Sequence, residues 1–127
     1  MRPPHAAKIE VKKLNKGFNR CVCMAFAVFH AEIFDKKLDK FSVDFKNWVD
    51  KIEDQLTENP YAGDPIKVKW FREKKLGKYR LYYLIYEEEK AIYMVGISEK
   101  KDQQKVISTL WFLLDEFKAD IQNLTKK

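Results

Sequence analysis

The sequence contains little of the chemistry that builds disulfide frameworks, zinc sites or histidine-based active sites. Its 127 residues include two cysteines, Cys21 and Cys23, and two histidines, His5 and His30. A single intervening residue strains a disulfide between the cysteines, and two thiols with distant imidazoles do not make a convincing zinc site. We therefore expect reduced thiols, no metal or other cofactor, and a cytoplasmic location.

Long apolar runs are also missing. No apolar run approaches the roughly 18 residues that a membrane-spanning helix needs. The start of the chain, MRPPHAAKIEVKKLNKGFNR, has neither a long apolar stretch nor a cleavage site of small residues, so a secretion signal is not expected. We expect a soluble protein with no membrane partner.

The sequence up to residue 23 differs from the rest. Residues 2–5, RPPH, fit neither a helix nor a central strand, and the stretch after them has weak periodicity. Regular patterning begins at Met24, which suggests the hypothesis that Met24 is the true start of the protein. We predict an N-terminal extension over residues 1–23, disordered or not native, and a single domain over residues 24–127.

Positive charge is in excess. Lysine and arginine total 25 against 19 aspartates and glutamates, which gives a formal net charge of +6, while 46% of the residues are hydrophobic. The hydrophobic content excludes a disordered chain. The charge favours an anionic partner such as nucleic acid, an acidic protein or a membrane surface, although a merely lysine-rich soluble protein is an equal alternative.

The first half of the chain predicts a strand and two helices. MAFAVFH, residues 24–30, has the near-continuous apolar character of a buried strand. A helix is expected over residues 31–41, and a second runs from its cap, Ser42, to the Asn59-Pro60 breaker. The short link between them predicts a helical hairpin.

The second half predicts an antiparallel meander and a helix. Its elements are, in order, a strand from Ile66, a turn at Gly77, strands over residues 79–86 and 91–97 with the turn EEEK between them, and one long helix from about Asp102. The fold class is therefore α+β. We expect an N-terminal strand, a helical hairpin, a three-stranded antiparallel meander that completes one sheet, and a long C-terminal helix.

Basic side chains gather at the predicted meander. Arg72 and Lys74 come from its first strand, Arg80 from the second, and Lys100 and Lys101 from the end of the third. Because neighbouring strands lie about 4.8 Å apart, we expect these side chains to reach a common anion. Further expected RNA contacts are Lys67, Lys69, Lys75 and Lys78, with the rings of Tyr82 and Tyr86.

This combination suits the cleavage of RNA without a metal ion. A base takes the proton of the 2′-hydroxyl, and cations stabilise the extra negative charge on the phosphate. The sequence has no acidic pair spaced for a metal nuclease, no glycine-rich phosphate loop and no Ser-His-Asp set, and its histidines lie outside the basic cluster. The alternative is a solvated strand face, since edge strands commonly carry lysine to prevent strand pairing.

The order of motifs resembles a known toxin family. FDKKLDKF, NPYAGDPIKV, FREKKLGKYRLYYLIY and ISEKKDQQKVI follow one another as in the RelE/ParE superfamily of toxins from type II toxin–antitoxin modules. The resemblance covers about residues 24–107, and its most specific pieces are GKYRLYY and SEKKDQQ. It implies a RelE-like toxin domain over residues 24–127 and a cognate antitoxin as partner.

The RelE branch implies a metal-independent endoribonuclease that cuts mRNA in the ribosomal A site and so inhibits translation. Arg80 matches the arginine of the family's YR motif, and Lys100 or Lys101 falls where the branch has a catalytic basic residue. The resemblance implies that these residues stabilise the phosphate. Lys74, with Arg72 nearby, is the candidate for proton transfer.

The sequence departs from the RelE pattern in two places. Val106 and Ile107 occupy the region where RelE-type enzymes often have a tyrosine that stacks on the cleaved nucleotide. Two alternatives follow: Tyr82 or Tyr86 substitutes for it, or the ribonuclease activity is weak or absent. The C-terminal helix is also longer and more apolar, which leaves a homodimer and a heterotetramer with the antitoxin both open. The alternative functions are a ParE-like inhibitor of DNA gyrase and a non-catalytic module that binds RNA or an acidic protein.

Overall fold

The computed structural model describes residues 25–126, so the predictions about residues 1–23 and about Met24 lie outside the described residues. The described part has four α-helices, two short 3-10 helices and five strands. In chain order they are β1 (Ala27–His30), α2 (Glu32–Leu38), α3 (Val43–Glu58), η2 (Pro60–Ala62), β2 (Asp64–Ile66), β3 (Val68–Leu76), β4 (Tyr79–Tyr86), β5 (Ala91–Glu99), η3 (Lys100–Asp102), α4 (Gln103–Phe112) and α5 (Leu114–Thr125).

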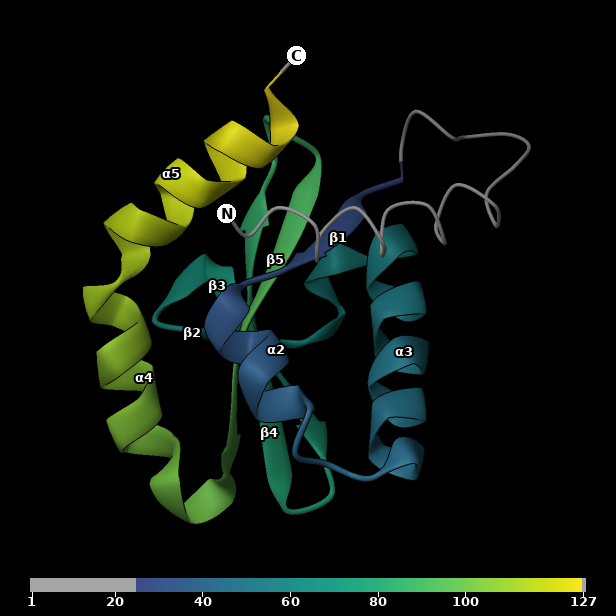
Figure 1. Ribbon diagram of the computed structural model, residues 1–127. Helices are drawn as coiled ribbons and strands as arrows, with labels where there is room; N and C mark the ends of the chain where they lie inside the picture. The colour runs from purple at the N-terminus through teal and green to yellow at the C-terminus, as the bar shows by residue number, and fades with distance from the viewer. Residues whose placement is uncertain (1–24, 127) are drawn as a thin grey trace.

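One mixed sheet with the strand order β1-β5-β4-β3-β2 forms the centre of the fold (Figure 1). β1 is parallel to β5, and the other neighbouring strands are antiparallel. The predicted α+β class is confirmed. β2 is an additional short strand that the sequence analysis did not predict.

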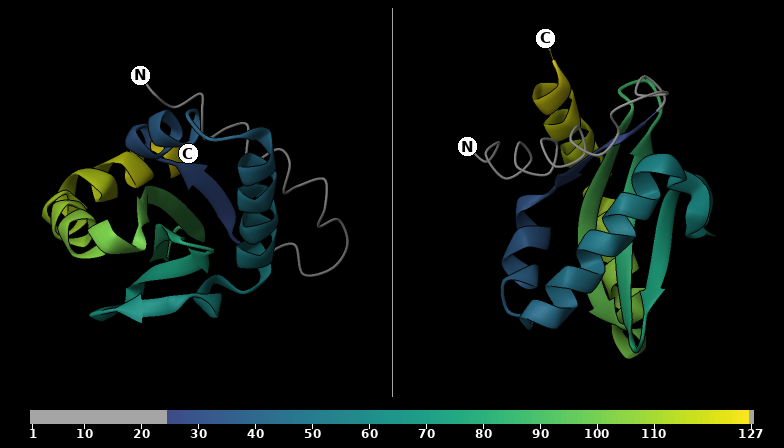
Figure 2. Two further views of the ribbon diagram at one scale, coloured as in Figure 1. Left: turned by 90° about the horizontal axis from the view of Figure 1, so that it is seen from below. Right: turned by 90° about the vertical axis from the view of Figure 1, so that its right-hand side faces the viewer.

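Helices cover both faces of this sheet. α3 lies on one side, and α4 and α5 lie on the other (Figure 2). On the first side, Tyr79 packs edge-on against Phe41 and Phe45, each at a ring-centroid distance of 5.2 Å. On the second, Tyr93 packs edge-on against Phe117 at 5.8 Å. Because both faces are covered, β4 and β5 are buried along nearly their whole length.

Helix α3 begins where the sequence predicts. The Ser42 hydroxyl accepts a hydrogen bond from the Phe45 backbone N–H at 3.2 Å, which satisfies one of the unpaired donors of the first turn. The apolar residues of α3 are divided between the core and the surface: Val49 and Leu56 are buried, whereas Trp48 is 53% exposed.

The first strand of the meander is not continuous from Ile66. Lys67 has a φ of 63°, in the left-handed region, and the chain turns there from β2 into β3. β2 then lies beside β3, with Pro65 paired to Arg72 and Ile66 paired to Val68. The alternation of apolar and basic residues continues through the turn, so it gave no sign of this break.

The C-terminal helix is interrupted at Leu113. This residue has φ −97° and ψ 8°, so α4 and α5 are separate helices at an angle to each other (Figure 1). The side chains that they bury are Ile107 and Leu110 on α4 and Phe117 and Ile121 on α5. The prediction of one continuous helix is wrong, because a sheet twists and a straight helix cannot follow it over this length.

Candidate functional site

The register between β3 and β4 decides which basic residues lie together. Lys75 is directly opposite Arg80, whereas Lys74 is opposite Leu81. Opposite residues share a face and neighbours along a strand alternate, so Arg72 and Lys74 lie on one face and Arg80 on the other. The predicted convergence of Arg72 and Lys74 with Arg80 is therefore wrong.

Arg80 lies near the end of the β3–β4 hairpin and is only 7% exposed. Its Nη1 donates to the carbonyl oxygens of Gly77 at 3.0 Å and Tyr79 at 2.9 Å. Across the sheet it is level with Lys75 on β3 and Ser98 on β5. The guanidinium therefore holds the turn and brings a positive charge to the face of the sheet that α4 covers.

A buried polar network lies next to Arg80. The Tyr82 hydroxyl and the Ser98 Oγ are 2.9 Å apart, and Ser98 donates to the Glu99 carbonyl at 3.0 Å, so Tyr82 is the donor to Ser98. Burial raises the pKa of the Tyr82 phenol, which keeps that proton in place. The Gln103 amide, at the start of α4, donates to the Glu73 carboxylate on β3. The network thus fixes the start of α4 over this end of the sheet.

The buried position of Tyr82 excludes the stacking role predicted for it. The side chain has no exposed surface, and a Cβ on Gly96 would lie 3.4 Å from the Tyr82 ring and 2.9 Å from Leu110. Gly96 therefore permits α4 to pack closely over the ring. Tyr86 lies at the other end of β4, opposite Ala91, and roughly 20 Å along the strand from Arg80.

The exposed lysines complete what we call the hairpin-end cluster: Lys75, Lys78, Arg80, Lys100 and Lys101. The Lys100 N–H donates to the Lys78 carbonyl at 2.9 Å, which holds η3 against the hairpin turn. Within the described part these lysines form two ion pairs, and both are long and exposed: Lys101 with Glu99 (3.9 Å) and Lys75 with Asp64 (3.8 Å). Such pairs are weak, so the cluster can bind an external anion.

Arg72 has a different role from the one predicted. Its guanidinium donates to the backbone carbonyls of Gly63 (2.8 and 3.0 Å), Lys69 (2.7 Å) and Tyr61 (3.3 Å), and it lies 5.1 Å from the centroid of the Tyr61 ring. These bonds join η2 and β2 to β3. Arg72 is therefore a structural residue of the sheet edge. Lys69 Nζ also lies over Tyr61, at 5.7 Å.

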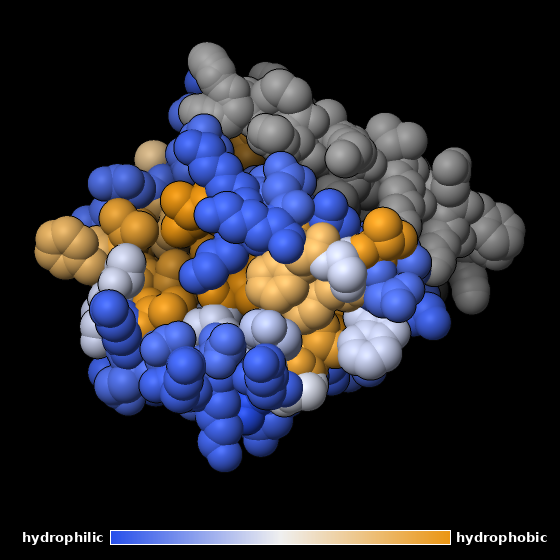
Figure 3. Space-filling model, turned by 60° about the horizontal axis from the view of Figure 1, so that its bottom comes forward, coloured by the Kyte–Doolittle hydropathy of each residue, from blue (hydrophilic) through white to orange (hydrophobic). Residues whose placement is uncertain are grey.

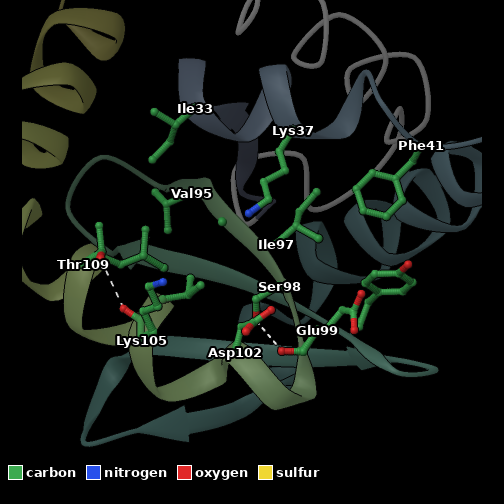
Figure 4. A pocket seen from close by; sticks show the side chains of 14 residues that line it. Ile33, Lys37, Phe41, Val95, Ile97, Ser98, Glu99, Asp102, Lys105 and Thr109 are labelled. Carbon is green, nitrogen blue, oxygen red and sulfur yellow. Dashed lines mark hydrogen bonds between the residues drawn. The ribbon is translucent and has the colours of Figure 1, made fainter.

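A groove of about 560 Å³ lies between α2, β5 and α4 (Figure 4). Pairing between β1 and β5 ends at His30 and Met94, so the β5 residues beyond Met94 line the groove and, within the described part, pair with β4 but have no strand on their β1 side. Ile33, Val95 and Ile97 give it apolar walls. Seen from the end of the molecule, hydrophobic side chains lie in a hollow between two hydrophilic bands (Figure 3).

The groove leads to the hairpin-end cluster. Ser98, Glu99 and Asp102 lie together at its lower end, and Lys37 extends into it from α2 (Figure 4). Lys105 of α4 is on the opposite wall. These groove residues were not predicted from the sequence, because three distant segments supply them. The only available signal was the run of charged residues after β5.

No helix in the described part of the chain is long and apolar enough to cross a membrane. No family model matches the sequence, and no curated protein matches it significantly.

Solved structures of toxins are similar in fold. A mutant of the Escherichia coli RelE toxin in the free state superposes with a TM-score of 0.58 at 19% identity, over 64% of this chain and 90% of that chain. The intact E. coli RelBE toxin–antitoxin complex matches with a TM-score of 0.53 at 19% identity, over 59% of this chain and 95% of that chain. The RelB–RelE antitoxin–toxin complex of Methanococcus jannaschii matches with a TM-score of 0.50 at 14% identity, over 61% of this chain and 95% of that chain. The chain therefore has a RelE-like toxin fold.

Proposed function

We propose that this chain is the toxin of a toxin–antitoxin pair and that it cuts mRNA on the ribosome, in the cytoplasm, as one RelE-like domain over residues 24–127. The observation that carries the proposal is the hairpin-end cluster, which brings Arg80, Lys100 and Lys101 to the mouth of a groove. The antitoxin partner is suggested by the toxin–antitoxin complex that shares the fold. The reaction class and the dependence on the ribosome come from the resemblance of the sequence motifs to the RelE branch.

The proposed reaction needs no metal ion. The 2′-oxygen of a nucleotide attacks the adjacent phosphorus, the bond to the 5′-oxygen breaks, and a 2′,3′-cyclic phosphate and a 5′-hydroxyl form. Arg80 and the lysines Lys100 and Lys101 stabilise the added negative charge on the phosphate. Lys74 lies outside both the hairpin-end cluster and the groove, so the role of proton acceptor passes to a group that lines the groove beside the cluster. We assign it to Glu99, whose carboxylate lies 3.9 Å from the Lys101 ammonium.

The first test is toeprinting of a reporter mRNA during in vitro translation, with the purified protein added. We expect cuts confined to the ribosomal A site and no cuts in the same mRNA without ribosomes. Glu99→Gln should lower the cutting rate by about 100-fold or more, because a general base contributes that much. Glu58→Gln, at the exposed end of α3, is the matched control and should cut at the parent rate.

The outcomes of this test separate the parts of the proposal. If the mRNA stays intact and translation continues, the ribonuclease function is wrong. If the parent cuts and Glu99→Gln cuts equally well, the function stands and the assignment of Glu99 is wrong.

A second candidate is inhibition of DNA gyrase, as in the ParE branch. It is favoured by the burial of Arg80, which uses Nη1 on two backbone carbonyls, and by the aliphatic residues Val106 and Ile107 at the start of α4. A DNA supercoiling assay tests it. Inhibition of supercoiling with intact mRNA would favour gyrase, and no effect in either assay would favour a binding module.

A further inference from the structure

Two exposed tryptophans stack on each other at the β2–β3 edge of the sheet, away from the groove. Trp70 of β3 and Trp111 of α4 have ring centroids 6.1 Å apart and planes only 11° from parallel. They are 41% and 37% exposed, and Phe112, the next residue on α4, is 86% exposed. We call these three residues, with Lys67, the tryptophan face.

The backbone of the sheet edge holds this arrangement in place. The pairing between β2 and β3 goes directly from Pro65–Arg72 to Ile66–Val68, so the β3 residues between Val68 and Arg72 have no partners on β2. Such a bulge redirects side chains, and bulges are common next to binding sites. Trp111 is supported from below by the buried Phe71, whose ring is 5.7 Å away. The rings are therefore fixed by packing before any ligand binds.

A cation accompanies the exposed rings. Lys67, held in the left-handed conformation at the corner of the edge, places its Nζ 5.5 Å from the centroid of the Trp111 ring. A base that stacks on an indole carries a phosphate on each side, within reach of flexible lysine side chains. Proteins that bind unpaired nucleic acid combine aromatic platforms with nearby cations in this way.

We propose that the tryptophan face binds unpaired RNA bases by stacking, as a second contact separate from the hairpin-end cluster. The pairing of flat, pre-positioned rings with the Lys67 ammonium favours RNA over a purely apolar protein segment. The inference shares the class of partner with the proposed function, but it depends on different residues. Stacking makes the contact tolerant of sequence, since every base has a π-face.

The test measures binding of a fluorescein-labelled 12-nucleotide uridine RNA to the whole chain by fluorescence anisotropy, without ribosomes. Trp70→Leu and Trp111→Leu keep apolar packing but remove the stacking surface, and each should raise the Kd roughly fivefold or more. Trp48→Leu is the matched control, because Trp48 is an exposed tryptophan on α3. It should bind as the parent does.

The lysine is tested through salt dependence. Lys67→Gln should flatten the slope of log K against log salt by about 0.7, the value for one phosphate contact on a single strand. Lys51→Gln, an exposed lysine on α3, should leave the slope unchanged. If Trp111→Leu unfolds, which a thermal melt would show, Trp70→Leu and Lys67→Gln still decide the question.

Three results would overturn the inference. The first is an RNA affinity of Trp70→Leu equal to that of the parent. The second is a loss of RNA affinity in the control Trp48→Leu as large as the loss in Trp70→Leu. The third is that variants of the tryptophan face bind RNA normally but no longer bind the purified antitoxin. The last result would make the tryptophan face a protein-docking surface. If the parent protein binds the RNA through the tryptophan face but does not cut mRNA on the ribosome, the proposed function is wrong and the inference about the tryptophan face stands.

Discussion

His30 shows how one residue joins three elements. Its Nδ1 lies 2.6 Å from an Asp35 carboxylate oxygen on α2, and its Nε2 lies 2.5 Å from a Glu53 carboxylate oxygen on α3, while His30 itself ends β1. Both nitrogens donate only in the imidazolium form. Burial by itself would lower the pKa of His30, but the hydrogen bonds to Asp35 and Glu53 and their negative charges raise it to about 9.

This pair of bonds predicts a loss of stability at alkaline pH. The folded-state pKa lies above the unfolded value of about 6.5, so the contribution of His30 is complete below pH 6.5 and disappears as the pH rises through about 9. The free energy of unfolding should fall by up to about 3 kcal/mol between pH 6.5 and pH 10. Urea titrations at several pH values measure it. His30→Gln should have a lower free energy of unfolding than the parent at pH 6.5, and its free energy of unfolding should change less between pH 6.5 and pH 10. Equal stability of the parent at both pH values would contradict a charged His30.

At the scale of elements, Gly63 is the point where η2, β2 and β4 meet. Its N–H donates to the Tyr83 hydroxyl at 3.0 Å, and that hydroxyl donates to the Pro60 carbonyl at 2.7 Å. A Cβ at this position would lie 2.4 Å from the Glu73 carbonyl oxygen and 2.8 Å from the Tyr83 oxygen. Since a backbone atom cannot move away cheaply, no side chain fits.

Gly63→Ala should therefore destabilise the protein by about 1–3 kcal/mol or more, which is the cost of overpacking. Gly77→Ala is the matched comparison, because Gly77 has φ +62° and open space where its Cβ would be. The free energy of unfolding of Gly77→Ala should fall by only about 1 kcal/mol, because alanine is less stable than glycine in the left-handed backbone conformation. Unfolding midpoints in urea measure both. A Gly63→Ala protein that is no less stable than Gly77→Ala would contradict this, because it would show that the backbone at the edge of the sheet moves to make room for the added Cβ.

At the scale of the molecule, the question is whether total charge or its location matters for activity. The proposed site contains exposed cations at one end of the sheet, but lysines are also spread over α2, α3 and α5. A general field would act through the net charge and weaken with added salt, whereas a site needs cations at one place. The two mechanisms differ in a charge-matched comparison.

Two triple variants make that comparison, since each lowers the formal net charge from +6 to +3. Lys78, Lys100 and Lys101 changed to Gln should lower mRNA cutting on the ribosome by about 10-fold or more, because transition-state cations are lost. Lys40, Lys51 and Lys118 changed to Gln should leave cutting near the parent rate. A similar loss in both would mean that the total charge, and not the hairpin-end cluster, drives activity.

The sequence by itself determined the kinds and approximate positions of most elements. The strand that ends at His30, the cap at Ser42, the end of α3 at Asn59 and the strand Tyr79–Tyr86 all follow from local rules of periodicity, capping and chain breaking. These rules depend on neighbours along the chain, so they can be read without knowing the fold. The resemblance to RelE toxins relied on the same local order.

The tertiary structure alone decided which side chains meet. A shift of one residue in the β3–β4 register moves a side chain to the other face, and this separated Lys74 from Arg80. The turn at Lys67, the break at Leu113 and the contact between Trp70 and Trp111 likewise depend on packing between distant segments. The basic cluster could be anticipated because its charges are concentrated in one part of the sequence. The groove and the tryptophan face could not, because they exist only where separate elements pack together.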